Sequence, residues 1–112
     1  MTDIDALAIG ERHGRTGIVV NSRKSPRRIR FSLAHEMGHI FLGHFRTDIE
    51  IDAIRKMAME YAANAFAAEL IMPQHLNTLC GWTPSTLSLA CGVSRQAARI
   101  RIRSWATGQS TP

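Results

Sequence analysis

Two histidines and one glutamate stand close together at His35, Glu36 and His39, in the pattern His-Glu-x-x-His. On an α-helix, positions four residues apart lie one turn apart on the same face, so both imidazoles can bind one metal ion while the acid points at a water beside it. A chain of this composition would contain such a match by chance roughly 0.01 times. The pattern therefore predicts a zinc site suited to metal-assisted peptide hydrolysis, provided that neighbouring residues support it.

The residues around this pattern are largely apolar. Phe31 and Leu33 precede it, and Ile40 to Leu42 follow it. In the alternative interpretation, both histidines are ordinary helix residues that bond to backbone or solvent, and the acid is a surface charge. Neutral imidazoles in a largely buried helix need a polar partner, however, because an unpaired buried polar group is costly. The context therefore favours a metal.

A second helix is predicted from about residue 52 to 72. This segment is rich in Ala, Met, Leu and Glu, contains no Gly or Pro, and ends before Pro73. Apolar residues recur along it with a helical period, at Ile54, Met57, Ala58, Tyr61, Ala65, Ala68 and Met72. Such a helix can bring a further metal ligand to the first one.

A catalytic zinc usually has three protein ligands and leaves its fourth position to water. Glu60, 21 residues after His39, can supply the third ligand from the second helix. Asn64 follows one turn later, where its amide can hydrogen-bond a ligand and fix its orientation. Glu69 is the rival carboxylate, but we expect it to be solvated near the helix end. The placement favours Glu60.

Two segments resemble the ImmA/IrrE family of bacterial and phage metallopeptidases, namely RFSLAHEMGHIFLGH (Arg30–His44) and EYAANAFAAELIMP (Glu60–Pro73). That family is similar to a reduced gluzincin, a zincin whose third ligand is a Glu on a later helix. GIVVNS (Gly17–Ser22) resembles the strand that precedes the family's active-site helix. The similarity covers nearly the whole chain.

The resemblance implies one zinc ion (Zn2+) per chain bound by His35, His39 and Glu60, with Glu36 as the general base and Asn64 orienting the site. The implied activity is that of a zinc-dependent endopeptidase with a protein substrate. For this family, the implied substrate is a helix-turn-helix transcriptional repressor, cleaved to switch on a phage, mobile element or stress programme. We expect no attached repressor domain, so that such a partner would act in trans.

Two other functions stay open. In one, a non-catalytic regulatory module uses a structural zinc and binds DNA, a repressor or a toxin partner through its C-terminal helices. In the other, the chain is half of a toxin–antitoxin pair with the zinc fold as a scaffold. Glu36 argues against both, since a structural zinc has no use for an acid between its histidines. Tyr61, His44 and His75 are candidates to stabilise an oxyanion, and the sequence assigns the role to none of them.

These elements predict an α+β fold, a mostly helical zincin-like single domain over residues 1–106. We expect a small N-terminal β-hairpin over 1–21 with a turn at His13-Gly14. Its second strand could border the cleft and pair with an extended substrate, or simply cover the helices. The active-site helix is predicted over about 26–42, with Ser25 as its N-cap and Gly43 as its stop.

After Pro73 the chain predicts three short helices, over about 73–79, 84–91 and 95–105, and then a disordered tail over 107–112. The stretch Thr86–Trp105 resembles a helix-turn-helix with its turn at Gly92-Val93-Ser94, although Ser88 stands where that motif usually has Ala. Gln96 is the one obvious base-reading candidate. The charges that could track phosphates are Arg95, Arg99, Arg101 and Arg103. Because phosphate contacts do not specify sequence, we expect a structural or partner-binding element rather than a DNA reader.

The composition of the 112-residue chain, 45% hydrophobic with a net charge of +5, suits one core and weak attraction to polyanions. We expect the basic run SRKSPRRIR at residues 22–30 to be a solvated surface rather than a binding site for acidic partners. Cys80 and Cys91 lack CxxC spacing, so we expect reduced, partly buried thiols. No membrane span or secretory signal is predicted, and we expect a cytoplasmic protein.

Overall fold

A computed structural model describes residues 6–12, 15–43, 52–79 and 81–108. The predicted turn at His13-Gly14, together with His44 and Cys80, lies outside these residues. The elements in chain order are β1 (Ala6–Arg12), β2 (Arg15–Val20), α1 (Pro26–Phe41), α2 (Ala53–Ile71), the 3-10 helix η1 (Gln74–Thr78), α3 (Pro84–Cys91) and α4 (Arg95–Thr107). The described part of the chain is mostly helical, in keeping with the predicted α+β class.

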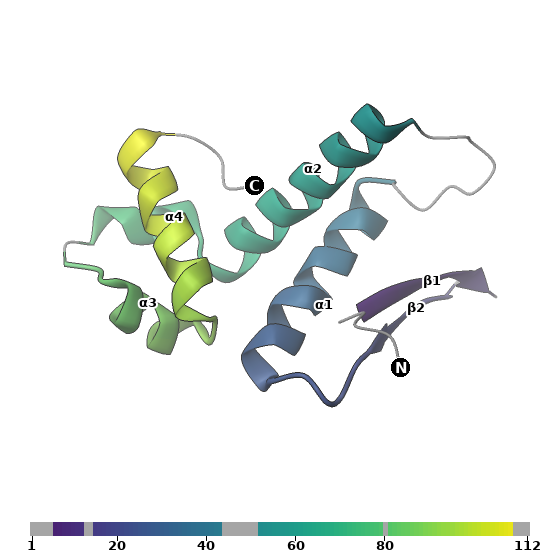
Figure 1. Cartoon of the computed structure of the whole chain (residues 1–112), viewed down its shortest axis with the longest axis horizontal. Coiled ribbons are helices and arrows are strands. Elements are labelled where there is room, and N and C mark those ends of the chain that lie inside the picture. Colours follow the sequence, from purple (N-terminus) through teal and green to yellow (C-terminus); the bar gives the residue numbers. More distant parts are fainter. Residues whose placement is uncertain (1–5, 13–14, 44–51, 80, 109–112) are drawn as a thin grey trace.

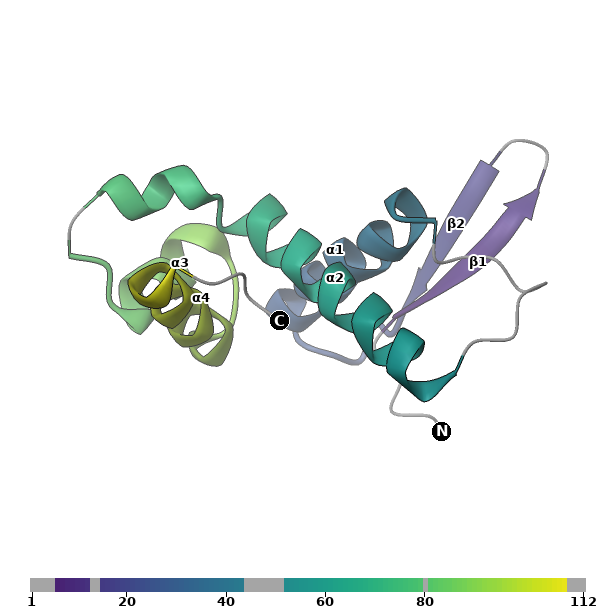
Figure 2. The ribbon, with the colours of Figure 1, turned by 90° about the horizontal axis from the view of Figure 1, so that it is seen from above.

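The elements form three groups along the molecule (Figure 1). The helices α1 and α2 run side by side in opposite directions in the middle. The strands β1 and β2 pair antiparallel and pack against α1, with Ala6 opposite Val20 and a register shift between Ile9 and Arg12. The helices α3 and α4 pack on each other at the far end of α2 (Figure 2). The central helix pair is thus held between a small sheet and a second helical pair.

Local capping signals set the helix bounds close to those predicted. Ser25 caps α1 by accepting a hydrogen bond from the backbone N–H of Arg28, and Gly43 follows the helix with a φ of +75° that favours glycine. Asp52 caps α2 in the same way by accepting from the N–H of Arg55 at 2.7 Å. The caps fix where α1 and α2 start and therefore which residues of each lie on one face.

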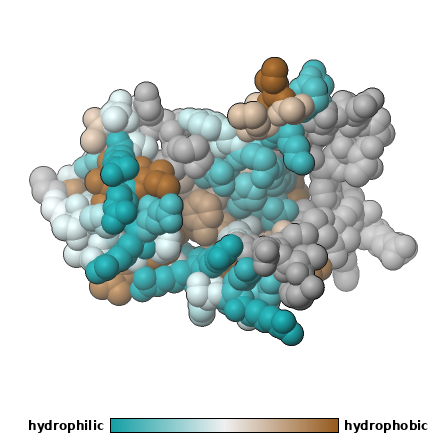
Figure 3. All heavy atoms as spheres, viewed as in Figure 1, coloured by the Kyte–Doolittle hydropathy of each residue, from teal (hydrophilic) through white to brown (hydrophobic). Residues whose placement is uncertain are grey.

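The buried face of α2 differs from the apolar period seen in the sequence. Ile54 and Met57 are 81% and 71% exposed, and Figure 3 shows hydrophobic side chains at the surface at this end of the helix. Of the residues in that period, Ala68 and Met72 are fully buried, and the other fully buried residues of this segment are Ala63 and Ala67. In an alanine-rich helix nearly every face carries apolar residues, so the period alone does not decide which one packs.

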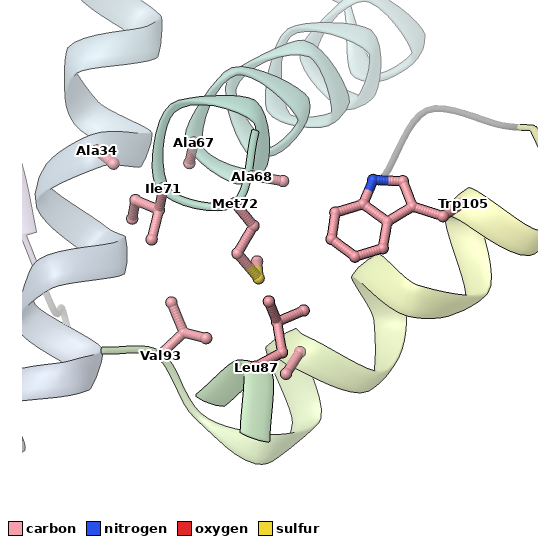
Figure 4. Packing of buried hydrophobic residues seen from close by; sticks show 9 residues of the cluster. Ala34, Ala67, Ala68, Ile71, Met72, Leu87, Val93 and Trp105 are labelled. Atoms are coloured by element: carbon pink, nitrogen blue, oxygen red, sulfur yellow. The ribbon is translucent and has the colours of Figure 1, made fainter. Parts of the chain in front are cut away.

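The hydrophobic core lies where the C-terminal end of α2 meets α3 and α4 (Figure 4). Met72, Leu87 and Val93 are fully buried there, and Trp105 closes the cluster from α4. The thiol of Cys91 packs at its edge, and burial raises the pKa of Cys91 while the nearby Arg30 charge lowers it in part. The partial burial expected of this thiol is thus confirmed.

The prediction that Arg101 could contact phosphates is wrong. Its side chain is buried on α4, where Nε donates to the carbonyl oxygen of Met72 at 2.8 Å and the guanidinium pairs with Glu69. The guanidinium also lies over the ring of Trp105. Glu69 is exposed near the end of α2, as expected, and it also pairs with Arg101 because the fold brings α4 against this end of the helix.

The basic run at residues 22–30 is only partly a solvated surface. Arg27 donates from Nη1 to the hydroxyl oxygen of Ser88 at 2.8 Å, and Arg30 donates from Nε to the carbonyl oxygen of Cys91 at 3.1 Å. Ser88 in turn donates to the carbonyl oxygen of Val93 at 2.6 Å. The serine that departs from the usual alanine therefore links α1 to the turn between α3 and α4.

The end of α4 corrects the predicted tail. The helix continues to Thr107, whose hydroxyl donates to the carbonyl oxygen of Arg103, and Gly108 ends it with a φ of +72°. Residues 109–112 lie outside the described part of the chain. Among the described helices, none combines the length and apolar character that a bilayer crossing requires.

Candidate metal centre

The structure brings the predicted site residues together between α1 and α2. His35, Glu36 and His39 project from α1, and Glu60 and Asn64 come from α2. Candidate ligand atoms of His35, His39 and Glu60 all lie within 4.8 Å of one another. Glu69, the rival carboxylate, is occupied by Arg101 and by the backbone N–H of Gln74 instead. Of the two candidate carboxylates, Glu60 is the one at this site.

The distances within this group suit a tetrahedral ion. The Nε2 atoms of His35 and His39 are 3.1 Å apart, and the Glu60 oxygens lie 3.2 Å and 2.6 Å from them. Ligand atoms about 2.0–2.1 Å from a tetrahedral zinc stand about 3.3 Å from one another. Two imidazole nitrogens and a carboxylate are also a donor set that zinc prefers, so the residues present fit this metal.

Asn64 determines which nitrogen of His35 faces the group. Its side-chain oxygen lies 2.7 Å from Nδ1 of His35, so this nitrogen donates its hydrogen to the amide oxygen. The Nε2 atom then carries the lone pair and points at His39 and Glu60. The arrangement is the one expected of a residue that orients a metal ligand.

Glu36 stands beside the three candidate ligands without joining them. Its carboxylate oxygen is 3.8 Å from Nε2 of His35, which is longer than a hydrogen bond, and its side chain is only 15% exposed. The Glu60 side chain is 50% exposed and thus opens the site to solvent on the α2 side. A carboxylate at this distance can reach a water that sits between it and a bound ion.

Gly38 allows the two helices to come this close. A Cβ at this position would lie 3.1 Å from the Ala63 carbonyl oxygen and 3.1 Å from the Phe66 Cβ. These are tight contacts, and the first is with backbone, which cannot turn aside. Gly38 was not among the predicted site residues, although a glycine inside a helix that faces an alanine-rich partner was the available signal.

A pocket of about 430 Å³ opens next to the candidate ligands. Its lining comes from both helices and from β1, namely Ala6, Phe31, Ser32, His35, Glu36, Glu60 and Asn64. The first strand thus borders it through Ala6, whereas the sequence left open whether the second strand borders the cleft or covers the helices. Tyr61 and His75 are not among the described residues that line this pocket.

The fold and the site together define a class. Two antiparallel helices present two histidines and a glutamate around one point, with an acid alongside and solvent access, which is the donor arrangement of a mononuclear metallohydrolase. The chain belongs to the IrrE N-terminal-like domain family, the peptidase family M78, whose sequence model matches residues 2–103. The predicted family is thereby confirmed, and with it a metallopeptidase type of function. Comparisons with curated proteins and with solved structures give no match.

Proposed function

We propose that this protein is a zinc-dependent endopeptidase, with His35, His39 and Glu60 as the metal ligands and Glu36 as the general base. The observation that carries the proposal is the Glu60 carboxylate, which lies at hydrogen-bond distance from both Nε2 atoms although it belongs to another helix. A metal ion shared by the two ring nitrogens and the carboxylate would offset the repulsion among these three metal-binding groups. The family supports a metal at this position, typically zinc.

In this mechanism Glu36 and Asn64 have separate roles. A bound zinc ion would polarise the scissile carbonyl and make a water acidic enough to act as the nucleophile. Glu36 takes the proton of that water and later delivers it to the leaving amine. Asn64 holds His35 in the tautomer that leaves Nε2 free. No side chain needs to form a covalent bond with the substrate.

The substrate that we propose is a protein, and more specifically a helix-turn-helix transcriptional repressor cleaved in trans. Support comes from the family resemblance together with the open side of the site at Glu60 and Ala6, which leaves room for an extended chain. The outer edge of β1 can offer backbone hydrogen bonds to such a chain. Such bonds would hold a backbone with little preference for sequence.

The test compares the wild type with Glu36→Gln and Glu60→Gln. Glu36→Gln should keep stoichiometric zinc and a native fold but lose cleavage by at least about 100-fold, because a general base contributes about 10²–10⁴ in rate. Glu60→Gln should lose both zinc and cleavage. The readout is metal analysis of the purified chains, together with the proteins that disappear in cells expressing the wild type but persist with Glu36→Gln. Continued cleavage by Glu36→Gln would refute the proposal.

A non-catalytic regulatory module remains the second candidate, and one observation favours it. Arg95, Arg99 and Arg103 are exposed along α4, where they can contact a nucleic acid or an acidic partner. With Arg101 buried, three rather than four of the predicted charges are available for such a contact. Transcription in the same two cell lines distinguishes the two functions. A binding module would change transcription equally in cells that express the wild type and in cells that express Glu36→Gln.

A further inference from the structure

A second pocket lies beside the candidate metal centre, between α1, α2 and the start of α4. Its volume is about 250 Å³, and most of its lining is apolar, from Phe31, Ala68, Met72, Ala97 and Ile100. The pocket at the metal centre has a more polar lining, which includes His35, Glu60, Glu36 and Ser32. The two hollows therefore differ in the chemistry that they can accommodate.

Phe31 and Asn64 line both pockets and form the ridge between them. Phe31 lies one turn before His35 on α1, and Asn64 lies one turn after Glu60 on α2. The apolar pocket thus begins one helical turn away from the candidate ligands. A peptide with a carbonyl at the metal centre can place a neighbouring side chain across this ridge.

We infer that the apolar pocket is a specificity pocket for one large apolar side chain of the substrate, next to the scissile bond. This inference rests on the proposed endopeptidase function and adds the chemical class of residue that the site selects. A cavity of about 150 Å³ is already enough to bind benzene, so this pocket can take a phenyl or an isobutyl group. The helix α4 then contributes to substrate choice through Ala97 and Ile100.

The experiment uses two metal-binding probes that differ only in an apolar group. Acetohydroxamic acid and 3-phenylpropanohydroxamic acid are titrated by calorimetry into the zinc-loaded full chain. The phenyl compound should bind at least about ten-fold more tightly than acetohydroxamic acid, because burial of the phenyl group removes apolar surface from water. In a parallel NMR titration, only the phenyl compound should shift the methyl resonance of Met72, which lines the pocket.

Variants on α4 locate the effect. Ala97→Phe fills the pocket and should reduce the advantage of the phenyl compound to within about two-fold, with the affinity for acetohydroxamic acid unchanged. Ala106→Phe makes the same substitution at an exposed position of the same helix and should keep the full advantage. If Ala97→Phe does not fold, Ile100→Ala removes an apolar wall instead and should weaken the phenyl compound alone.

The outcomes separate this inference from the proposed function. If neither probe binds the zinc-treated chain, the metal centre is refuted and the pocket assignment falls with it. If both probes bind equally well, the metal centre stands and the specificity pocket is overturned. Equal losses in Ala97→Phe and Ala106→Phe would also overturn it, since the effect would then not come from the pocket.

Discussion

The two ring nitrogens of His35 have different roles, and the hydrogen bond to Asn64 determines which nitrogen carries the hydrogen. The amide oxygen accepts from Nδ1 at 2.7 Å, so Nε2 faces His39 and Glu60 as a lone-pair donor. Without this partner, His35 would also populate the other tautomer, in which Nε2 carries the hydrogen and has no lone pair to offer a metal. We therefore expect zinc binding to depend on an amide that is not itself one of the three candidate ligands.

Replacing Asn64 tests this at the scale of one residue. Asn64→Leu keeps the shape of the side chain but removes the acceptor, and we expect zinc to bind about 10–100-fold more weakly. Zinc affinity is measured by competition with a coloured chelator. Asn77→Leu, at an exposed position of η1, is the control and should leave the affinity unchanged. Equal affinity of Asn64→Leu and the wild type would show that the amide does not orient the ligand.

The contact between α1 and α2 is made by small residues. Gly38 faces Ala63 so closely that a methyl group would meet the backbone, and Ala67 continues the same buried face. Close approach matters here because the site draws its ligands from both helices. A few tenths of an ångström in helix spacing change the distance from Glu60 to both histidines.

Gly38→Ala separates this packing effect from helix propensity. Propensity alone favours alanine in a helix by about 1 kcal/mol. The tight contact with the Ala63 backbone should outweigh it, since overpacking costs about 1–3 kcal/mol, so we expect lower stability and weaker zinc binding. Urea unfolding and chelator competition measure the two quantities. Higher stability with unchanged zinc affinity would mean that the helices do not need the glycine.

The helix α4 is anchored by a buried charge. Arg101 bonds to the Met72 carbonyl and to Glu69 and stacks over Trp105, so it ties α4 to the end of α2. Arg101→Met should lower the free energy of unfolding by about 1.5–3 kcal/mol, the usual value of a hydrogen bond to a charged group. Arg103→Met, the same substitution at an exposed position two residues later, should cost less than about 0.5 kcal/mol. Similar losses in both variants would contradict the anchoring role.

At the scale of the whole molecule, a metal bound between α1 and α2 would join two segments that are far apart in the chain. Binding to the folded state alone stabilises it by about 2.7 kcal/mol when free zinc is 100 times its dissociation constant. We therefore expect chelator treatment to lower the Tm by about 10 °C or more, with recovery on adding zinc. Differential scanning fluorimetry measures the shift. His39→Ala should show no such dependence, and a Tm insensitive to zinc in the wild type would speak against the site.

The sequence by itself determined whatever depends on local geometry. His35 and His39 share a face because the helix repeat places them one turn apart, and the caps at Ser25 and Asp52 fix where α1 and α2 begin. The family also followed from short motifs and was confirmed. The end of α4 could also have been predicted, because a glycine such as Gly108 commonly follows the last residue of a helix.

The tertiary structure alone decided which distant residues meet. The alanine-rich α2 looks apolar on most sides, and its contacts with Gly38 and with the core residues of α3 and α4 select the face that is buried. Arg101 and Glu69 pair because α4 folds back onto the end of α2, a contact that no spacing in the chain encodes. The apolar pocket beside the candidate ligands arises from the same docking of α4. Helix repeats fix angles within one element, whereas the distance between elements depends on how their side chains pack.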